Sequence, residues 1–263
     1  MSERLVKLTT ADGVATLTLD RPARRNALTR ELLSQLSTAV TQVAADSTTR
    51  LLVLDGSGPA FCAGMDLDEM QARAAAPDSK AQWDQDAAAF RDAIVAIFRA
   101  DVPTLAVVHG PAIAGGFGIV LACDLVLATP NAKFSLPEVK RGISPAVVSP
   151  LLLYRIGNGP AMPLLLEGRT INGDEAHRLG LCHYLSAPER LVETRAELIR
   201  ALLGGAPQAL AVTKRLVRSF ALDTLIQQLE AGRKVSAEAR GSGEAREGLA
   251  AFQEKRDPKW VPR

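Results

Sequence analysis

The sequence predicts an α/β fold that is followed by a layer of helices. Two passages, residues 51–70 and 104–122, each combine an apolar strand, a loop containing glycine and the start of a helix. From residue 188 onward the pattern is helical, with four predicted helices and no strand. A chain of 263 residues that is 47% hydrophobic is long enough to bury a large core.

The composition argues against several classes of partner. Formal charges nearly cancel at +2, so the charge of the whole chain favours neither nucleic acid nor a membrane surface. Cys62, Cys123 and Cys182 lie in apolar stretches, which indicates reduced, buried thiols and a cytoplasmic compartment. No stretch reaches the roughly 18 uncharged apolar residues that a membrane span needs. The ligand spacings of a metal site are also missing.

The N-terminal elements are predicted from turn and capping signals. Residues 5–10 and 14–19 alternate apolar and polar side chains around Asp12-Gly13, which indicates a β-hairpin with a type I′ turn. Thr29 is placed to cap a helix that continues to residue 44. Residues 51–54 are all apolar, as in a strand buried on both faces of a parallel sheet.

A long amphipathic helix is predicted over residues 81–99, after a helix start at 66–70 and a linker at 74–79. We interpret its apolar stripe as core rather than as the wall of a substrate pocket. The stripe consists of Trp83, Phe90, Ile94, Ile97 and Phe98.

Short strands and helices are predicted to fill the second half of the chain. Strands are expected at residues 104–108 and 125–128, a short extended piece at 133–135 and a loop at 166–173. The helices expected after the glycine-rich stretch span residues 145–156, 160–166, 174–179, 188–203, 207–220, 224–240 and 243–254.

Gly115-Gly116 is a candidate anion site. The pair follows a strand and opens a helix, where free backbone N–H groups lie at the positive end of the helix dipole. Glycine also lets a substrate approach the backbone closely. The alternative for this motif alone is tight packing of the helix against the strand.

Glu138 is the candidate acid/base. It follows an apolar segment at residues 134–137, and burial there would raise the pKa of its carboxyl group, as proton transfer near neutral pH requires. The alternative is an ion pair with Lys140 or Arg141, and the residues alone favour neither reading.

Six motifs lie along the chain in a fixed order. They are Arg24-Arg-Asn-Ala-Leu28, Ala60-Phe-Cys-Ala-Gly-Met-Asp-Leu67, Ala114-Gly-Gly-Phe-Gly118, Phe134-Ser-Leu-Pro-Glu-Val139, Leu166-Glu-Gly168 and Phe252-Gln-Glu-Lys-Arg256. Through them the chain resembles the enoyl-CoA hydratase/isomerase family, the crotonases, over nearly its whole length. The resemblance implies the α/β crotonase (ClpP-like) fold, with repeated ββα units and a C-terminal helical region. It also implies a core with the CoA and active site over residues 1–200, a helical oligomerisation region over 201–263, and trimers or pairs of trimers.

The resemblance also implies site roles. Backbone N–H groups of Met65 and Gly115 would hold the thioester carbonyl oxygen as it becomes an enolate, and Glu138 would transfer the proton. Coenzyme A would enter as part of the substrate, with no further cofactor and no metal. The residues expected to contact the acyl-CoA are Arg24, Ala63, Asp66, Leu67, Gly118, Phe252 and Lys255.

Position 118 departs from the family pattern. Typical hydratases carry two glutamates, and Gly118 stands where the first is expected, so Glu138 would act alone. Residues 138–150 resemble bacterial hydratases of branched glutaconyl-type CoA esters, which combine a glycine at that position with one glutamate. We therefore expect an enoyl-CoA hydratase that forms an oxyanion-stabilised enolate with one glutamate as acid/base.

Other functions stay open at this point. A Δ3-Δ2 enoyl-CoA isomerase needs only one carboxylate, because a single base can take a proton from C2 and return it at C4. The same fold also supports decarboxylation and dehalogenation. A catalytically degenerate member could be a binding or scaffold protein, although the near-neutral charge disfavours RNA as its ligand.

Overall fold

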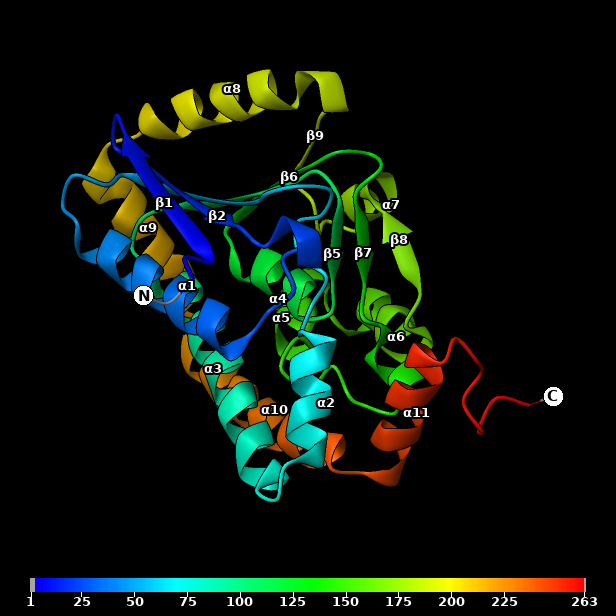
Figure 1. The fold of residues 1–263 in the computed structure, drawn as a ribbon. Coiled ribbons are helices and arrows are strands. Elements are labelled where there is room, and N and C mark those ends of the chain that lie inside the picture. Colours follow the sequence, from blue (N-terminus) through cyan, green and yellow to red (C-terminus); the bar gives the residue numbers. More distant parts are fainter. Residues whose placement is uncertain (1–2, 263) are drawn as a thin grey trace.

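The structure is a computed structural model that describes residues 3–262. Met1 and Ser2 of the expected core (1–200) and Arg263 of the expected helical region (201–263) lie outside the described residues. It contains two β-sheets covered by helices (Figure 1). In the larger sheet the strand order is β1-β2-β3-β4-β6-β9, with β1 antiparallel to β2 and the other pairs parallel. Its strands are β1 (Val6–Ala11), β2 (Val14–Leu19), β3 (Leu51–Gly56), β4 (Thr104–Val108), β6 (Leu125–Ala128) and β9 (Tyr184–Leu185).

The smaller sheet receives one strand after each pass through the larger one. β4 is followed by β5 (Pro111–Ile113) and α4 (Gly115–Ala122), and β6 is followed by β7 (Lys133–Ser135) and the short 3-10 helix η2 (Pro137–Arg141). An isolated bridge between Cys62 and Ala112 makes a similar pass after β3. β8 (Thr170–Asn172) completes this sheet, antiparallel to β7. These passes are the repeated ββα units that the family resemblance implies.

Local signals set the N-terminal elements as predicted. Asp12 (φ 51°) and Gly13 (φ 78°) both have the left-handed backbone that a type I′ hairpin turn requires. Thr29 Oγ1 accepts a hydrogen bond of 3.1 Å from the N–H of Leu32, which caps α1 (Arg30–Ala45).

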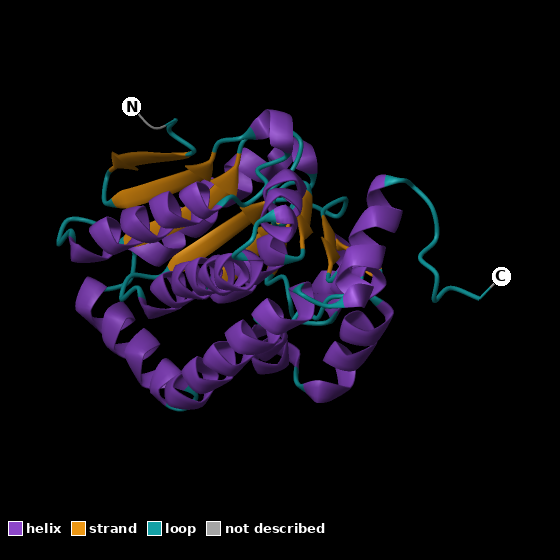
Figure 2. Ribbon diagram, turned by 60° about the horizontal axis from the view of Figure 1, so that its bottom comes forward, coloured by secondary structure: helices purple, strands orange, loops and turns teal. Residues whose placement is uncertain are grey.

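Both faces of the central strands are buried. One face packs under α8 (Leu191–Leu203), which lies above the larger sheet in Figure 1. The alternate residues face α1, α3 (Ser79–Arg99) and α4, and Figure 2 shows helices in front of the strands on this side. The side chains under α8 are Leu51, Val53, Leu105, Val107 and Leu127. A strand covered on both sides loses the alternation of polar residues, which explains the continuous apolar runs in the sequence.

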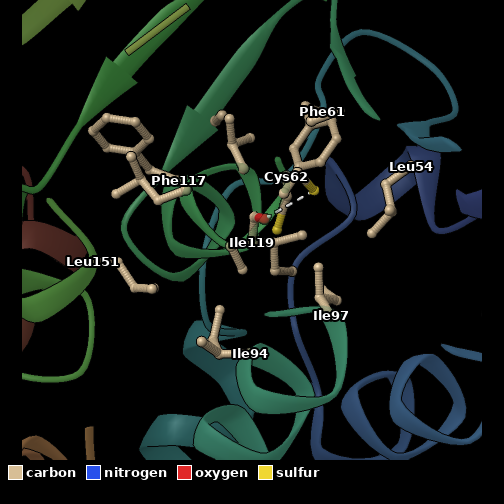
Figure 3. Close-up of a cluster of buried hydrophobic side chains, with 14 of the residues drawn as sticks. Leu54, Phe61, Cys62, Ile94, Ile97, Phe117, Ile119 and Leu151 are labelled. Carbon is tan, nitrogen blue, oxygen red and sulfur yellow. Dashed lines mark hydrogen bonds between the residues drawn. The ribbon is translucent and has the colours of Figure 1, made fainter. Parts of the chain in front are cut away.

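α4 lies at the centre of the larger core cluster. All of its residues are buried, and Phe117 and Ile119 lie among Leu54, Ile94 and Leu151 of other elements (Figure 3). A helix surrounded by protein is apolar on all sides, so it shows no amphipathic pattern.

Several short elements differ from the prediction. Residues 170–172 form β8, although the sequence indicates a loop over 166–173, because they pair with β7. The sequence did not predict β5 or β9, and α5 (Ser149–Ile156) begins later than residue 145 because residues 146–148 form a turn. Strands of two or three residues carry little pattern of their own, so tertiary pairing decides them.

Apart from η1, where the sequence indicated a turn, the remaining helices agree with the prediction within a few residues. α10 and α11 seat tightly on the segment after β7: a Cβ at Gly232 would overlap the carbonyl of Ala146, and one at Gly248 would overlap that of Arg141. No helix within residues 3–262 has the length and apolarity to cross a membrane. The helices that have not been named above are η1 (Pro22–Arg24), α2 (Leu67–Ala75), α6 (Asn158–Glu167), α7 (Gly173–Arg178), η3 (Pro188–Arg190), α9 (Pro207–Ser219), α10 (Leu222–Arg240) and α11 (Gly243–Gln253).

Candidate active site

Two loops meet at the carboxyl ends of β3 and β5. Gly64, in the loop after β3, has φ 89°, and a Cβ at Gly64 would lie 2.9 Å from the carbonyl oxygen of Ile113. The same Cβ position is 3.6 Å from the backbone nitrogen of Gly115. Because only glycine tolerates both this φ and this spacing, Gly64 allows the two loops to touch.

The backbone N–H of Met65 is free because its neighbours pair with Leu28. The N–H of Leu28 donates to Gly64 O at 2.8 Å, and the N–H of Asp66 donates to Leu28 O at 2.9 Å. In this short parallel bridge, residues 64 and 66 face Leu28, so the N–H of Met65 points to the other side. No described residue accepts a hydrogen bond from it.

The backbone N–H of Gly115 is free because Gly115 is the first residue of α4, where the helix supplies no acceptor. Ala114 before it has φ 51° and ψ −119°, a conformation that is rare for a residue with a Cβ. The N–H of Ala114 is held by Ser135 O at 2.8 Å. Residues 3–262 offer the Gly115 N–H no acceptor, and the dipole of α4 favours an anion there.

Met65, Gly115 and Glu138 line one pocket, which we call the catalytic pocket. They come from the loop after β3, the start of α4 and η2. Ala63 and Leu67, two of the expected acyl-CoA contacts, line it as well. The rest of its wall consists of Met70, Phe90, Ala114, Arg141, residues 143–148, Ser236, Arg240 and Leu249.

The carboxyl group of Glu138 is buried, and its Oε2 has no hydrogen-bond partner among the described residues. Burial raises the pKa of Glu138 to about 7, while a backbone hydrogen bond and the charges of Arg141 and Arg240 act in the opposite direction. Neither Lys140 nor Arg141 forms an ion pair with it in the described part of the chain. A carboxyl group that titrates near neutrality can both take and release a proton.

Gly118 is packed too tightly to carry a side chain. A Cβ at Gly118 would lie 2.9 Å from Cζ of Phe90 and 3.0 Å from Cγ2 of Val148. Gly118 does not line the catalytic pocket, whereas Phe90 and Val148 do, so aromatic and aliphatic groups occupy the space beside it. The stripe of α3 is core as predicted, but its member Phe90 is also pocket wall.

A second hollow adjoins the catalytic pocket, and we call it the outer groove. Arg24, Asp66, Leu67 and Phe252 line it, together with Arg141, whose guanidinium carbon lies 4.1 Å from the centre of the Phe252 ring. Its remaining walls come from Ala23, Arg25, Ala27, Ala63, Met65, Asp68 and Ile113.

The charged residues of the outer groove are partly engaged within the protein. Arg24 forms ion pairs with Asp66 at 3.7 Å and with Asp68. Asp66 caps α2 through the N–H groups of Asp68 and Glu69, so its first role is structural. Lys255 is exposed after the end of α11 and lines neither hollow.

Asn26 is a positioning residue that the sequence reasoning missed. It is fully buried with φ 55°, and its Nδ2 donates to the carbonyls of Ser57, Ala60 and Phe61 at 2.9, 2.9 and 3.1 Å. Its Oδ1 accepts from the N–H of Arg21 at 2.8 Å. The amide of Asn26 thus joins η1 to the loop that carries Met65. The signal for this role in the sequence was an asparagine within a basic turn, since asparagine tolerates a left-handed backbone and bonds to nearby backbone groups.

The three histidines bond to backbone groups. His109 Nε2 lies 2.8 Å from Gly58 O, His177 Nδ1 lies 2.9 Å from Cys182 O, and His183 Nδ1 accepts from the N–H of Val126 at 3.0 Å. The three cysteines are free and buried, and burial raises the pKa of each thiol to about 12.

The fold and the pocket define an α/β protein with a buried carboxyl group beside two backbone N–H groups that lack protein acceptors. The sequence profile of the enoyl-CoA hydratase/isomerase family matches residues 9–263. The chain is 33% identical over 252 residues to 1,2-epoxyphenylacetyl-CoA isomerase of Escherichia coli, with 95% of each protein covered. It is 34% identical over 256 residues to an enoyl-CoA isomerase/hydratase of Mycosarcoma maydis, covering 94% of this chain and 92% of the relative.

A solved structure supports the same assignment. The crystal structure of enoyl-CoA hydratase from Bacillus halodurans superposes with a TM-score of 0.89 at 28% identity, covering 94% of this chain and 100% of that one. The chain belongs to the enoyl-CoA hydratase/isomerase family, and it is an enzyme with the crotonase fold.

Proposed function

We propose that this enzyme is an enoyl-CoA hydratase that acts on an acyl-CoA thioester with Glu138 as its single acid/base. The catalytic pocket carries the proposal, because Glu138 is the one carboxylate among the described residues that line it. Its free Oε2 shares the pocket with the unpaired N–H groups of Met65 and Gly115.

The chemistry needs only these three groups. The Glu138 carboxylate takes a proton from water, and the water oxygen bonds to C3 of the enoyl chain. The C2–C3 π electrons shift toward the thioester, whose carbonyl oxygen becomes an enolate oxygen held by the N–H groups of Met65 and Gly115. Protonated Glu138 then delivers its proton to C2, which restores the thioester and the carboxylate.

Coenzyme A would extend from the catalytic pocket into the outer groove, where Arg24 can meet a phosphate and Phe252 the adenine ring. Ala63, Asp66 and Leu67 would border its path, and Gly118 would shape the floor beneath Phe90. Lys255 would contribute from the end of α11. We expect no cofactor besides the CoA of the substrate.

A Δ3-Δ2 enoyl-CoA isomerase is the second candidate. The tight packing at Gly118 favours it, because a site without a second carboxylate can still move one proton between C2 and C4. The two relatives compared above also bear isomerase in their names.

An assay with both substrate types separates the candidates. Purified enzyme is offered trans-2-enoyl-CoA esters, with hydration followed as loss of the conjugated double bond, and 3-enoyl-CoA esters, with isomerisation followed as its gain. A hydratase adds water to at least one 2-enoyl ester. Rapid isomerisation with no hydration of any 2-enoyl ester would show that the isomerase reading is the right one.

We also propose that the chain assembles as a trimer or as a pair of trimers through the C-terminal helices, the oligomerisation region of residues 201–263. α9 and the residue after it expose a stripe of large apolar side chains, which suits contact with another copy. These are Val212, Leu216, Val217 and Phe220.

A cytoplasmic location remains a prediction that rests on the three unpaired cysteines.

A further inference from the structure

Arg240 places a guanidinium group that forms no ion pair with a described residue in the wall of the catalytic pocket. It is the last residue of α10 and lines the pocket together with Ser236 and Leu249. Its Nη1 is buried and makes no hydrogen bond to any described residue. Since an arginine keeps its proton at neutral pH even when buried, a lasting positive charge lies there without an acceptor.

The two carboxylates whose charges act on Arg240, those of Asp86 and Glu138, serve other groups. Asp86 is buried and pairs with Arg30 at 2.6 Å and with Arg73 at 3.5 Å. Glu138 must stay free for proton transfer. Within residues 3–262 no carboxylate lies within 4.0 Å of the Arg240 nitrogens. A buried charge is expensive unless it is paired, so this arrangement points to an anion that the protein itself does not supply.

The geometry leaves the donating edge of the guanidinium available. Its central carbon lies 5.8 Å from the ring centre of Trp83, a distance at which the ring attracts the cation without using its N–H groups. The planar fork of N–H donors matches the two oxygens of a carboxylate.

A small hollow lies on the other side of Arg240, and we call it the distal pocket. It shares Leu67, Arg240 and Leu249 with the catalytic pocket, so the two adjoin. Arg246 brings a second positive charge, and the lining holds no carboxylate among the described residues. The other lining residues are Gln71, Ala74, Ala250 and Gln253.

Coenzyme A phosphates do not account for this site. Arg141 lines both the catalytic pocket and the outer groove, where the nucleotide would lie, but Arg240 does not line that groove. Arg240 therefore belongs to the part of the site that meets the acyl chain.

We infer that Arg240 binds a carboxylate at the far end of the acyl chain, so that the preferred substrate is an enoyl-CoA ending in a carboxylate rather than in a methyl group. The inference rests on the proposed function, because it takes the thioester to lie at Met65 and Gly115.

The test compares substrates whose acyl chains have the same length but different ends. Wild-type enzyme is assayed with trans-2-enoyl-CoA esters of five and seven carbons, each with either a methyl or a carboxylate end. We expect kcat/KM to favour the carboxylate at least tenfold in one pair. Arg240→Leu should lower this ratio at least 30-fold, and Arg240→Lys should retain part of it. Arg233→Leu is the control on the same helix, because its guanidinium pairs with Glu230 and Asp84 instead, and it should keep the wild-type ratio.

Binding separates failure of this inference from failure of the proposed function. Calorimetry with the saturated esters glutaryl-CoA and pentanoyl-CoA needs no turnover, and circular dichroism checks that each variant is folded. Tighter binding of glutaryl-CoA by wild type, lost in Arg240→Leu, supports the inference even if no enoyl ester is hydrated. Equal affinities, or a kcat/KM ratio near one in wild type, overturn it while leaving hydration in place. Should Arg240→Leu fail to fold, the wild-type ratios and Arg240→Lys decide.

Discussion

The buried carboxyl group of Glu138 links activity and stability to pH in opposite directions. Burial raises its pKa from 4.5 to about 7 in the folded protein. The folded chain therefore holds this proton more tightly than the unfolded chain. The resulting stabilisation is complete below pH 4.5 and is lost as the pH rises from there through about 7. Activity needs the carboxylate as a base, so we expect kcat/KM to rise over the upper part of the same range.

Replacing Glu138 by glutamine should separate these two effects. Glu138→Gln removes the base, so we expect kcat to fall by about 10³-fold or more. It also removes the buried charge, so at pH 8 the free energy of unfolding should rise by on the order of 2 kcal/mol, with little change at pH 4.5. Steady-state kinetics and denaturant unfolding at both pH values test this. Full turnover in the variant, or an equal stability gain at both pH values, would contradict it.

Gly64→Ala should lower kcat more than the same substitution at a glycine elsewhere that also has a positive φ. A Cβ at Gly64 would press on Ile113 O at 2.9 Å and displace the N–H groups of Met65 and Gly115. We expect kcat to fall about 10²-fold to 10³-fold, as for loss of an oxyanion donor. Gly180→Ala is the matched control, because Gly180 has φ 78° but nothing lies within 4 Å of its Cβ position. Similar losses of kcat in both variants would assign the effect to backbone strain alone.

At the scale of elements, the turn before α1 and the loop after β3 are joined by one side chain. Asn26→Asp keeps the left-handed backbone and the acceptor oxygen but removes the donors to Ser57, Ala60 and Phe61. Because buried carbonyls then lack a partner, we expect a loss of about 2–4 kcal/mol in unfolding free energy, together with reduced kcat.

Thr29→Ala is the comparison for this prediction. It removes a neighbouring cap hydrogen bond without touching the loop, at about 1 kcal/mol, and kcat should be nearly unchanged. A loss of kcat in Thr29→Ala as large as that in Asn26→Asp would show that the hydrogen bonds from Asn26 to the loop after β3 have no particular effect on catalysis.

Elements with strong local signals were predictable. The Asp12-Gly13 turn, the Thr29 cap and the strands at 104–108 and 125–128 agree with the structure because their residues determine them locally. β5, β8 and β9 depend on partners that are distant in the sequence. The site divides in the same way: local patterns indicated both glycine loops and Glu138, whereas Arg240 reaches the pocket only through the docking of α10.

At the scale of the whole molecule, the exposed stripe on α9 predicts how copies meet. Leu216 is 57% exposed although α9 is otherwise anchored, through Lys214 and Arg218, to Asp124. Leu216→Glu should shift the mass measured by light scattering toward that of a single 28.0 kDa chain. Val235→Glu, an exposed apolar position on α10, serves as the control and should leave the mass unchanged. An unchanged mass in Leu216→Glu would place the contact elsewhere.

The close seating of α10 and α11 on the segment after β7 has a consequence for synthesis on the ribosome. The sheets and the loops bearing Met65 and Gly115 emerge first, but Ser236, Arg240 and Leu249 complete the pocket only near the end of translation. Burial is what raises the pKa of Glu138 in the complete chain, so we expect that shift to depend on the closed pocket. We therefore expect a nascent chain without α10 and α11 to lack a complete pocket wall even after its sheets have formed.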